Sequence, residues 1–165
     1  MTDAFLAQVV LTDYPSPTVL ANLKRNASTA IPASLSTHYS IQGHEWGALD
    51  NSPFNTSHAH HFSRILAADC LWMPDQHANL VHSMLHFLTL DAEGRVFCTA
   101  GFHTGRAKLA AFFDVAAESG LVVEEVYEED AEGVRREWRV ERDGGREDHT
   151  ERKRWLVIAR LKRRS

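Results

Sequence analysis

The feature that most constrains this sequence is an alternation of short apolar runs with segments of helical periodicity. The runs have the length of buried strands, and the first two long ones are each followed by an aspartate. They span residues 8–12, 62–68, 95–100, 121–127 and 155–161, with a weaker run at 39–41. Because strand–helix repetition requires crossover connections, the pattern predicts an α/β fold with a mostly parallel sheet.

Helical periodicity fills three of the intervals between the runs. Ser16 provides an N-cap for a helix that we expect to end near Asn26, and Pro74 opens a second helix. A third helix follows the loop 101–105 and is expected to stop at Gly120. Since a turn-rich connection joins the last two strands, we expect the sheet to end in an antiparallel hairpin.

That connection, residues 124–154, is the most densely charged stretch of the chain. Trp138 is its isolated apolar residue, and Gly144 with Gly145 marks a turn. We interpret the stretch as a solvated, extended hairpin. The alternative is a docking surface for a protein partner, because tryptophan and arginine are common at interfaces.

Composition narrows the class of protein. A chain of 165 residues with 44% hydrophobic content suits one domain with its own core. A formal net charge of −4 offers no basic footprint, so no nucleic-acid partner is expected. Apolar stretches fall short of the roughly 18 to 20 residues of a membrane span, and the start lacks a secretion signal. We expect a cytoplasmic protein with Cys70 and Cys98 reduced and mostly buried.

The histidines invite a metal hypothesis. His58, His60 and His61 cluster in a loop, and His82 and His86 have the i, i+4 spacing of a helix. However, no glutamate follows His82, as a metalloprotease motif requires, and both cysteines are better explained as core. We therefore predict no metal site.

Several motifs, in order along the chain, resemble a known family. VLTDYP at 10–15, EWG at 45–47 and ADCLW at 68–72 resemble the second strand, the post-third-strand motif and the acidic motif of the seven-stranded lysine methyltransferase-like family. GFHTGR at 101–106 and ERKRW at 151–155 are similar to a fungal branch called nicotinamide N-methyltransferase-like. Members of that branch are also known as elongation-factor lysine methyltransferases.

The resemblance implies a Rossmann-like class I methyltransferase with the sheet order 3-2-1-4-5-7-6. It implies S-adenosyl-L-methionine as cofactor and a protein lysine, or another amine of a translation factor, as methyl acceptor. Nicotinamide stays open as an alternative acceptor. A different class also stays open: a non-catalytic, truncated methyltransferase-like protein that binds a partner.

The resemblance and the strand-end positions together indicate cofactor-binding residues. Asp13 is expected to accept hydrogen bonds from the ribose hydroxyls, and Trp46 to lie against the adenine ring. The alternatives are an aspartate in the turn before a helix and an ordinary aromatic at the sheet edge. Asp69 is expected to meet the amino group of the cofactor or to orient the acceptor amine; the alternative is a strand-end turn.

Two further residues are predicted for the acceptor side. Trp72 can wall the acceptor pocket and desolvate an amine, with core packing as the alternative. His103 lies at a strand end that should face the same crevice. We expect Asp13, Trp46 and Asp69 to share one edge of the sheet.

The start of the chain leaves little room for the first βα unit. Seven residues precede Gln8, and no glycine-rich strand-to-helix turn of the cofactor-binding kind occurs elsewhere. We expect a single methyltransferase domain over 1–165 without its first strand and glycine-rich loop. The open edges of such a sheet favour self-association, and the chain is expected to bind S-adenosylmethionine weakly or not at all.

Overall fold

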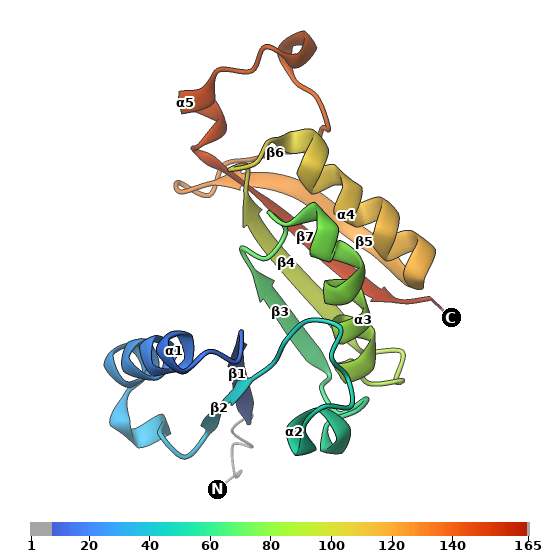
Figure 1. Ribbon diagram of the computed structural model, residues 1–165. Coiled ribbons are helices and arrows are strands. Elements are labelled where there is room, and N and C mark those ends of the chain that lie inside the picture. Colours follow the sequence, from blue (N-terminus) through green and yellow to red (C-terminus); the bar gives the residue numbers. More distant parts are fainter. Residues whose placement is uncertain (1–7, 165) are drawn as a thin grey trace, which may run out of the picture. The chain divides into compact units, whose positions relative to one another are not determined.

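The computed structural model describes residues 8–164 (Figure 1). The chain divides into two compact units, one ending at Ala48 and one beginning at Leu49.

The first unit is a two-stranded parallel sheet with a crossover helix. Strand β1 (Val9–Asp13) pairs with β2 (Tyr39–Gly43), and α1 (Pro17–Ala30) and the 3₁₀ helix η1 (Ala33–Leu35) connect them. Ser16 is the N-cap of α1, as predicted, although its side chain makes no capping hydrogen bond.

The prediction that the first helix ends near Asn26 is wrong, because α1 continues to Ala30. Ala27 is buried, and alanine has a high helix propensity, so the helix continues past Asn26. The helix ends where Ile31 precedes Pro32, and Ile31 has the extended conformation that a following proline imposes.

The second unit is a five-stranded sheet in the order β3-β4-β7-β5-β6. Its elements are α2 (Pro53–Ser57), β3 (Arg64–Ala68), η2 (Pro74–Gln76), α3 (His77–Phe87), β4 (Arg95–Gly101), α4 (Arg106–Ser119), β5 (Leu121–Asp130), β6 (Arg135–Glu137), η3 (Asp143–Gly145), α5 (His149–Arg152) and β7 (Trp155–Arg163). Strand β4 is parallel to β3, and β7 is antiparallel to both β4 and β5. Therefore β3, β4 and β5 run in one direction, and the predicted α/β class with an antiparallel finish is confirmed.

The strand orders agree with those expected of a class I methyltransferase. The pair β2-β1 corresponds to positions 3-2 of that sheet, and β3-β4-β7-β5 corresponds to 4-5-7-6. Among residues 8–164, β1 pairs only with β2 of the same unit.

Helices α3 and α4 lie on one face of the five-stranded sheet (Figure 1). Side chains of β4 and β7 alternate between buried and more exposed positions, as expected of strands with one covered face. The helices contribute Leu80, Val81, Met84, Leu109, Phe112 and Ala116 to the core. Gly120 ends α4 in the left-handed conformation with φ +106°, as predicted.

The prediction of a continuous buried strand over 62–68 is wrong. Strand β3 is shorter, Ala67 is its only buried side chain, and Leu66 is 69% exposed. Within the part of the chain that the structure describes, β3 has a sheet neighbour only in β4. Apolar composition marked a strand but could not show whether both its faces are covered.

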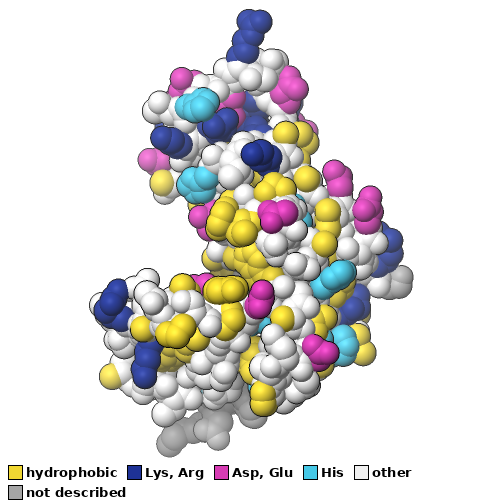
Figure 2. Space-filling view, in the orientation of Figure 1, with side chains coloured by type: hydrophobic (Ala, Val, Ile, Leu, Met, Phe, Trp, Pro, Cys, Tyr) yellow, Lys and Arg dark blue, Asp and Glu magenta, His cyan; other side chains and the backbone are white. Residues whose placement is uncertain are grey.

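The connection between β5 and β7 is also more structured than an extended, solvated hairpin. Its first part does form a hairpin, with β6 antiparallel to β5, and Gly144 and Gly145 turn the chain with positive φ angles. It then adds η3 and the short helix α5 before β7 begins. Charged side chains of both signs are interspersed over this end of the second unit (Figure 2).

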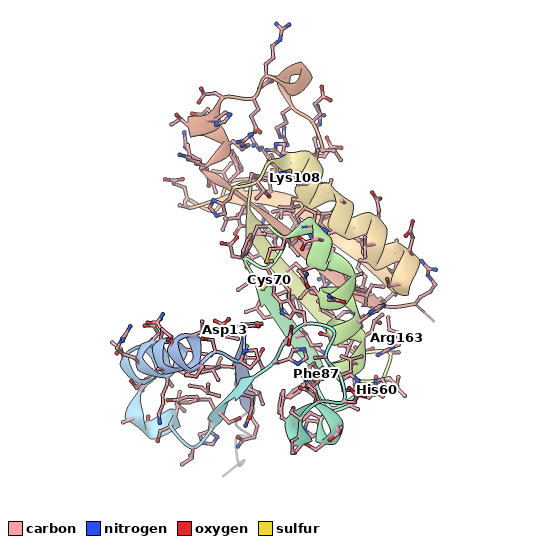
Figure 3. All side chains as sticks on the ribbon, viewed as in Figure 1. Asp13, His60, Cys70, Phe87, Lys108 and Arg163 are labelled. Atoms are coloured by element: carbon pink, nitrogen blue, oxygen red, sulfur yellow. The ribbon has the colours of Figure 1, made fainter. Side chains whose placement is uncertain are left out.

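The two cysteines differ in environment. Cys98 is buried in β4, and burial, followed by the nearby Cys70 thiol, raises its pKa to about 12. Cys70 is only partly buried and lies in the loop after β3, so the expectation of a mostly buried strand residue is wrong for it (Figure 3). No disulfide joins them within the described residues, as expected of reduced thiols.

No helix in residues 8–164 has the length and apolar character needed to cross a bilayer.

Candidate functional site

Asp13 is the last residue of β1 and is exposed at the carboxyl end of the strand (Figure 3). Its Oδ1 accepts a hydrogen bond of 2.7 Å from the backbone N–H of Tyr14, and its carbonyl accepts one of 2.9 Å from the N–H of His44. The first bond fixes the carboxylate beside the strand end. Since Ser16 is the N-cap of α1, Asp13 does not serve as the helix cap.

Trp46 lies in the turn that follows β2. The N–H of Ala48 donates to the carbonyl of Glu45 at 3.1 Å, and Gly47 has φ +83°. A β-turn with positive φ at its third residue favours glycine there, and it places Trp46 at the second position. Because β1 and β2 are parallel, this turn and Asp13 lie at the same end of the two-stranded sheet. The structure therefore brings two predicted cofactor residues together.

Asp69 follows β3 directly and has the left-handed backbone conformation, with φ +53°. Its N–H donates to the carbonyl of Thr99 at 2.7 Å, and its Oδ1 accepts from the N–H of Gly101 at 3.2 Å. Aspartate tolerates this region better than most residues, but the conformation is uncommon outside glycine. The strand-end turn considered as an alternative exists, and it directs the second oxygen outward.

That second oxygen meets the other predicted acceptor residue. Oδ2 of Asp69 lies 3.5 Å from Nε2 of His103, and the two side chains are 58% and 64% exposed. A Cβ added at Gly101 would lie 2.7 Å from the same Nε2, so the absence of a side chain at Gly101 makes room for the imidazole. The structure thus joins Asp69 and His103 at the carboxyl ends of two adjacent parallel strands, β3 and β4.

Trp72 lies on the surface of the same loop. Its side chain is 48% exposed, whereas the preceding Leu71 is fully buried. Leu71 therefore occupies the core position in this loop, and the alternative of core packing does not apply to Trp72. The indole is available to form an apolar wall beside the strand ends.

Sequence reasoning missed a residue that supports this loop. His77 is 1% exposed, and its Nε2 lies 3.0 Å from the carbonyl oxygen of Leu71. Its spacing to Leu80 and Val81 is helical, so extending the apolar stripe of α3 by one turn would have identified it. A protonated Nε2 donates to Leu71 and holds the loop that carries Asp69.

The clustered histidines bond to main-chain carbonyls. Nδ1 of His58 lies 3.0 Å from the oxygen of Phe54, and Nε2 of His86 lies 2.8 Å from that of Asn55. Residues 8–164 contain no group of three His, Cys, Asp or Glu side chains that could hold a metal ion. His58 and His86 therefore each have a structural hydrogen-bond partner.

The predicted site is divided between the two units. Asp13 and Trp46 belong to the first unit, whereas Asp69, Trp72 and His103 belong to the second. The expectation that they share one edge of a single sheet stays a prediction, as does the organisation of the chain as one domain.

Comparison with known proteins identifies relatives by sequence. The chain is 30% identical over 129 residues to a protein N-terminal and lysine N-methyltransferase of Emericella nidulans, covering 72% of this chain and 49% of that protein. It is 28% identical over 121 residues to a protein of the same name from Candida glabrata, covering 72% and 47%. The chain thus spans about half the length of the curated relatives it matches. No protein-family model matches it.

Comparison of structures identifies the fold. A methyltransferase from Mesorhizobium loti, described as S-adenosylmethionine dependent, aligns with a TM-score of 0.58 at 12% identity, covering 95% of this chain and 81% of that one. The [4+2]-cyclase SpnF aligns with a TM-score of 0.61 at 10% identity, covering 96% and 67%. By sequence the chain is similar to fungal protein N-terminal and lysine N-methyltransferases, and its α/β fold is like that of class I methyltransferases.

Proposed function

We propose that this chain is part of an S-adenosylmethionine-dependent N-methyltransferase that acts on an amine of a protein. The observation that carries the proposal is the sequence similarity to fungal proteins named for methylation of protein N-termini and lysines. The fold alone would not suffice, because a cyclase shares it. The resemblance of the motifs to elongation-factor methyltransferases makes a translation factor the proposed acceptor protein.

The residues of the first unit fit the nucleoside end of the cofactor. Asp13 presents an exposed carboxylate held by the N–H of Tyr14, and such a group accepts hydrogen bonds from ribose hydroxyls. Trp46 is half-buried at the same end of the sheet and offers an aromatic face for adenine. When bound, S-adenosylmethionine supplies an electrophilic methyl group on a positively charged sulfur.

The residues of the second unit fit an acceptor amine. An amine is a nucleophile only when its nitrogen lone pair is free, so the ammonium form must first lose a proton, to solvent or to a side chain of the protein. An ammonium group that donates to Oδ2 of Asp69 comes within reach of the His103 imidazole, which can accept a proton. The exposed indole of Trp72 provides an apolar surface that disfavours the charged form of the amine.

We expect binding of S-adenosylmethionine to be detectable by NMR titration, which measures even weak binding at individual residues. S-Adenosylmethionine should shift the backbone amide signals of Tyr14 and His44 and the indole N–H signal of Trp46. Asp13→Ala should weaken binding about 10- to 100-fold, because hydrogen bonds to a charged group contribute roughly 1.5–3 kcal/mol.

Asp75→Ala is the matched control, since Asp75 is also an exposed acid and lies outside both predicted halves of the site. Equal affinity in Asp13→Ala and the native chain would refute the ribose role. No shift at Tyr14 and Trp46 up to millimolar ligand would refute cofactor binding by this chain.

The same preparation separates the alternatives when it is supplied with a labelled methyl donor. Label in a peptide with free α- and ε-amines supports the proposal, and label in nicotinamide supports the alternative acceptor. Binding without transfer to either supports a non-catalytic protein. A cytoplasmic location and self-association through the open sheet edges stay predictions.

A further inference from the structure

A buried cluster of charges ties the connection between β5 and β7 to the body of the second unit. Glu128 of β5 is fully buried and receives a bidentate contact from Arg106, at 2.6 and 2.8 Å. Arg106 also holds Glu147 with a second bidentate contact, again at 2.6 and 2.8 Å. Arg136 and Arg142 complete the cluster at 2.7 and 3.2 Å from Glu128. We call the part of the connection that these contacts hold, residues 135–147, the clasp segment.

The cluster has a defined electrostatic state. Burial alone would raise the pKa of Glu128, but hydrogen bonds from Arg106 and Arg136 outweigh it and hold that pKa below its ordinary value. The hydrogen bond from Arg106 likewise lowers the pKa of Glu147. Both carboxylates are therefore ionised at neutral pH, and paired bidentate bonds fix the orientation of the Arg106 guanidinium.

The same guanidinium contacts an aromatic stack. It lies 4.0 Å from the ring centroid of Phe102, which is 4% exposed. Trp138 of the clasp segment is stacked on the same ring, with centroids 5.9 Å apart and planes 8° from parallel. Trp138 also contacts Phe113 of α4 edge to face. Trp138 therefore packs against the body of the second unit, although part of its side chain stays exposed.

Phe102 is the residue directly before His103. The loop that presents the imidazole to Asp69 starts at Gly101, at the end of β4, and finishes at Arg106, the first residue of α4. Phe102, a buried residue of this loop, contacts both Arg106 and Trp138, whereas the His103 side chain is mostly exposed to solvent. We propose that the clasp segment positions His103 in the acceptor site, with Arg106 and Trp138 as positioning residues.

A purely structural role for the cluster is the competing explanation. Buried ion pairs often add little stability relative to apolar packing, so their contribution to the unfolding free energy does not by itself explain the arrangement. The bidentate contacts do fix an orientation: each holds the plane of the Arg106 guanidinium, and this guanidinium lies over the ring of Phe102. The inference rests on the proposed function only in assigning His103 to the acceptor site.

The test is the ¹⁵N NMR spectrum of the His103 imidazole in the ligand-free chain at neutral pH. The signals are assigned by their loss in His103→Gln, and Asp69→Asn supplies the reference for an imidazole without its carboxylate. We expect Trp138→Ala to move the Nε2 signal toward that reference. Trp138→Phe preserves a stacked ring, so the Nε2 signal of His103 should stay at its native position in this variant.

Arg139→Gln is the matched control, because it is adjacent in sequence and its side chain forms only an exposed ion pair, with Glu137. It should leave the His103 signals unchanged. Arg106→Lys retains a positive charge without the bidentate geometry and should move the signal as Trp138→Ala does, which keeps the test informative if the alanine variant does not fold.

A folded Trp138→Ala or Arg106→Lys protein with native His103 signals would overturn the inference. Because the readout needs neither cofactor nor acceptor, it also separates the two proposals. Absence of methyl transfer with a His103 signal that still depends on Trp138 would refute the proposed function and leave the positioning role in place.

Discussion

Glu128→Gln is expected to lower the free energy of unfolding of the second unit by about 3–5 kcal/mol, the cost of breaking a buried ion pair from one side. Glu128 is fully buried among three arginines, which are Arg106, Arg136 and Arg142. The amide is nearly isosteric, but it carries no charge and turns one acceptor into a donor that faces guanidinium donors. Urea unfolding followed by far-UV circular dichroism measures the loss.

Glu137→Gln is the matched control, since Glu137 is a 73% exposed glutamate in an ion pair with Arg139. An exposed pair of this kind contributes little to stability, so the urea midpoint of Glu137→Gln should stay close to that of the native protein. Similar midpoints for both variants would show that the cluster is solvated in solution and does not hold the clasp segment.

The same cluster predicts a stability loss in acid. The pKa of Glu128 and of Glu147 is lowered by folding from the ordinary value of 4.5. A lowered folded-state pKa contributes stability that is present above the unfolded value and is lost as the pH falls through the folded value. The melting temperature should therefore fall as the pH drops below 4.5, and less steeply in Glu128→Gln. An equal acid dependence in both proteins would assign the loss to other carboxylates.

In the methyltransferase of which we propose this chain to be a part, Asp69→Asn is expected to lower methyl transfer by about 10²- to 10³-fold, within the range that a positioned proton acceptor contributes. Asparagine tolerates the left-handed conformation and retains an acceptor for the N–H of Gly101. The variant therefore removes the charge that faces His103 and keeps the local backbone. Transfer of labelled methyl to a protein or peptide amine is the measurement.

Asp75→Asn, a substitution of an exposed acid in η2, should retain native activity. Full activity in Asp69→Asn would exclude an acceptor role for the carboxylate. Asp69 was also predicted to contact the cofactor, and the ligand-induced shifts at Tyr14 and Trp46 separate the two roles. They should persist with unchanged affinity if Asp69 acts on the acceptor amine, and weaken if it binds the cofactor.

The residues that could be predicted from sequence are those whose roles follow from position along a strand or helix. Asp13 and Asp69 were identified because each comes directly after a strand, and His103 because it follows β4. The contact between Asp69 and His103, which the sequence analysis did not predict, depends on β3 and β4 being adjacent and parallel. Packing between segments distant in the sequence was harder to predict. The strand at 62–68 was predicted to be buried, for example, but most of its side chains are not.

By itself, the sequence determined the alternation of strands and helices, the stop of α4 at Gly120 and the residues at the strand ends, because these depend on local periodicity and backbone conformation. The order of the strands in the sheet followed from the family resemblance. Only the tertiary structure decided the role of the charged connection. Glu128 and Trp138 belong to a stretch that resembles a solvated surface. Glu128 is buried through its ion pair with Arg106, and Trp138 packs on Phe102, in each case with a partner more than 20 residues away in the chain. Pairing over such distances leaves no local periodic signal. The charge pattern of the connection therefore indicated an exposed surface, whereas in the tertiary structure the connection packs against Phe102 of the loop that carries His103.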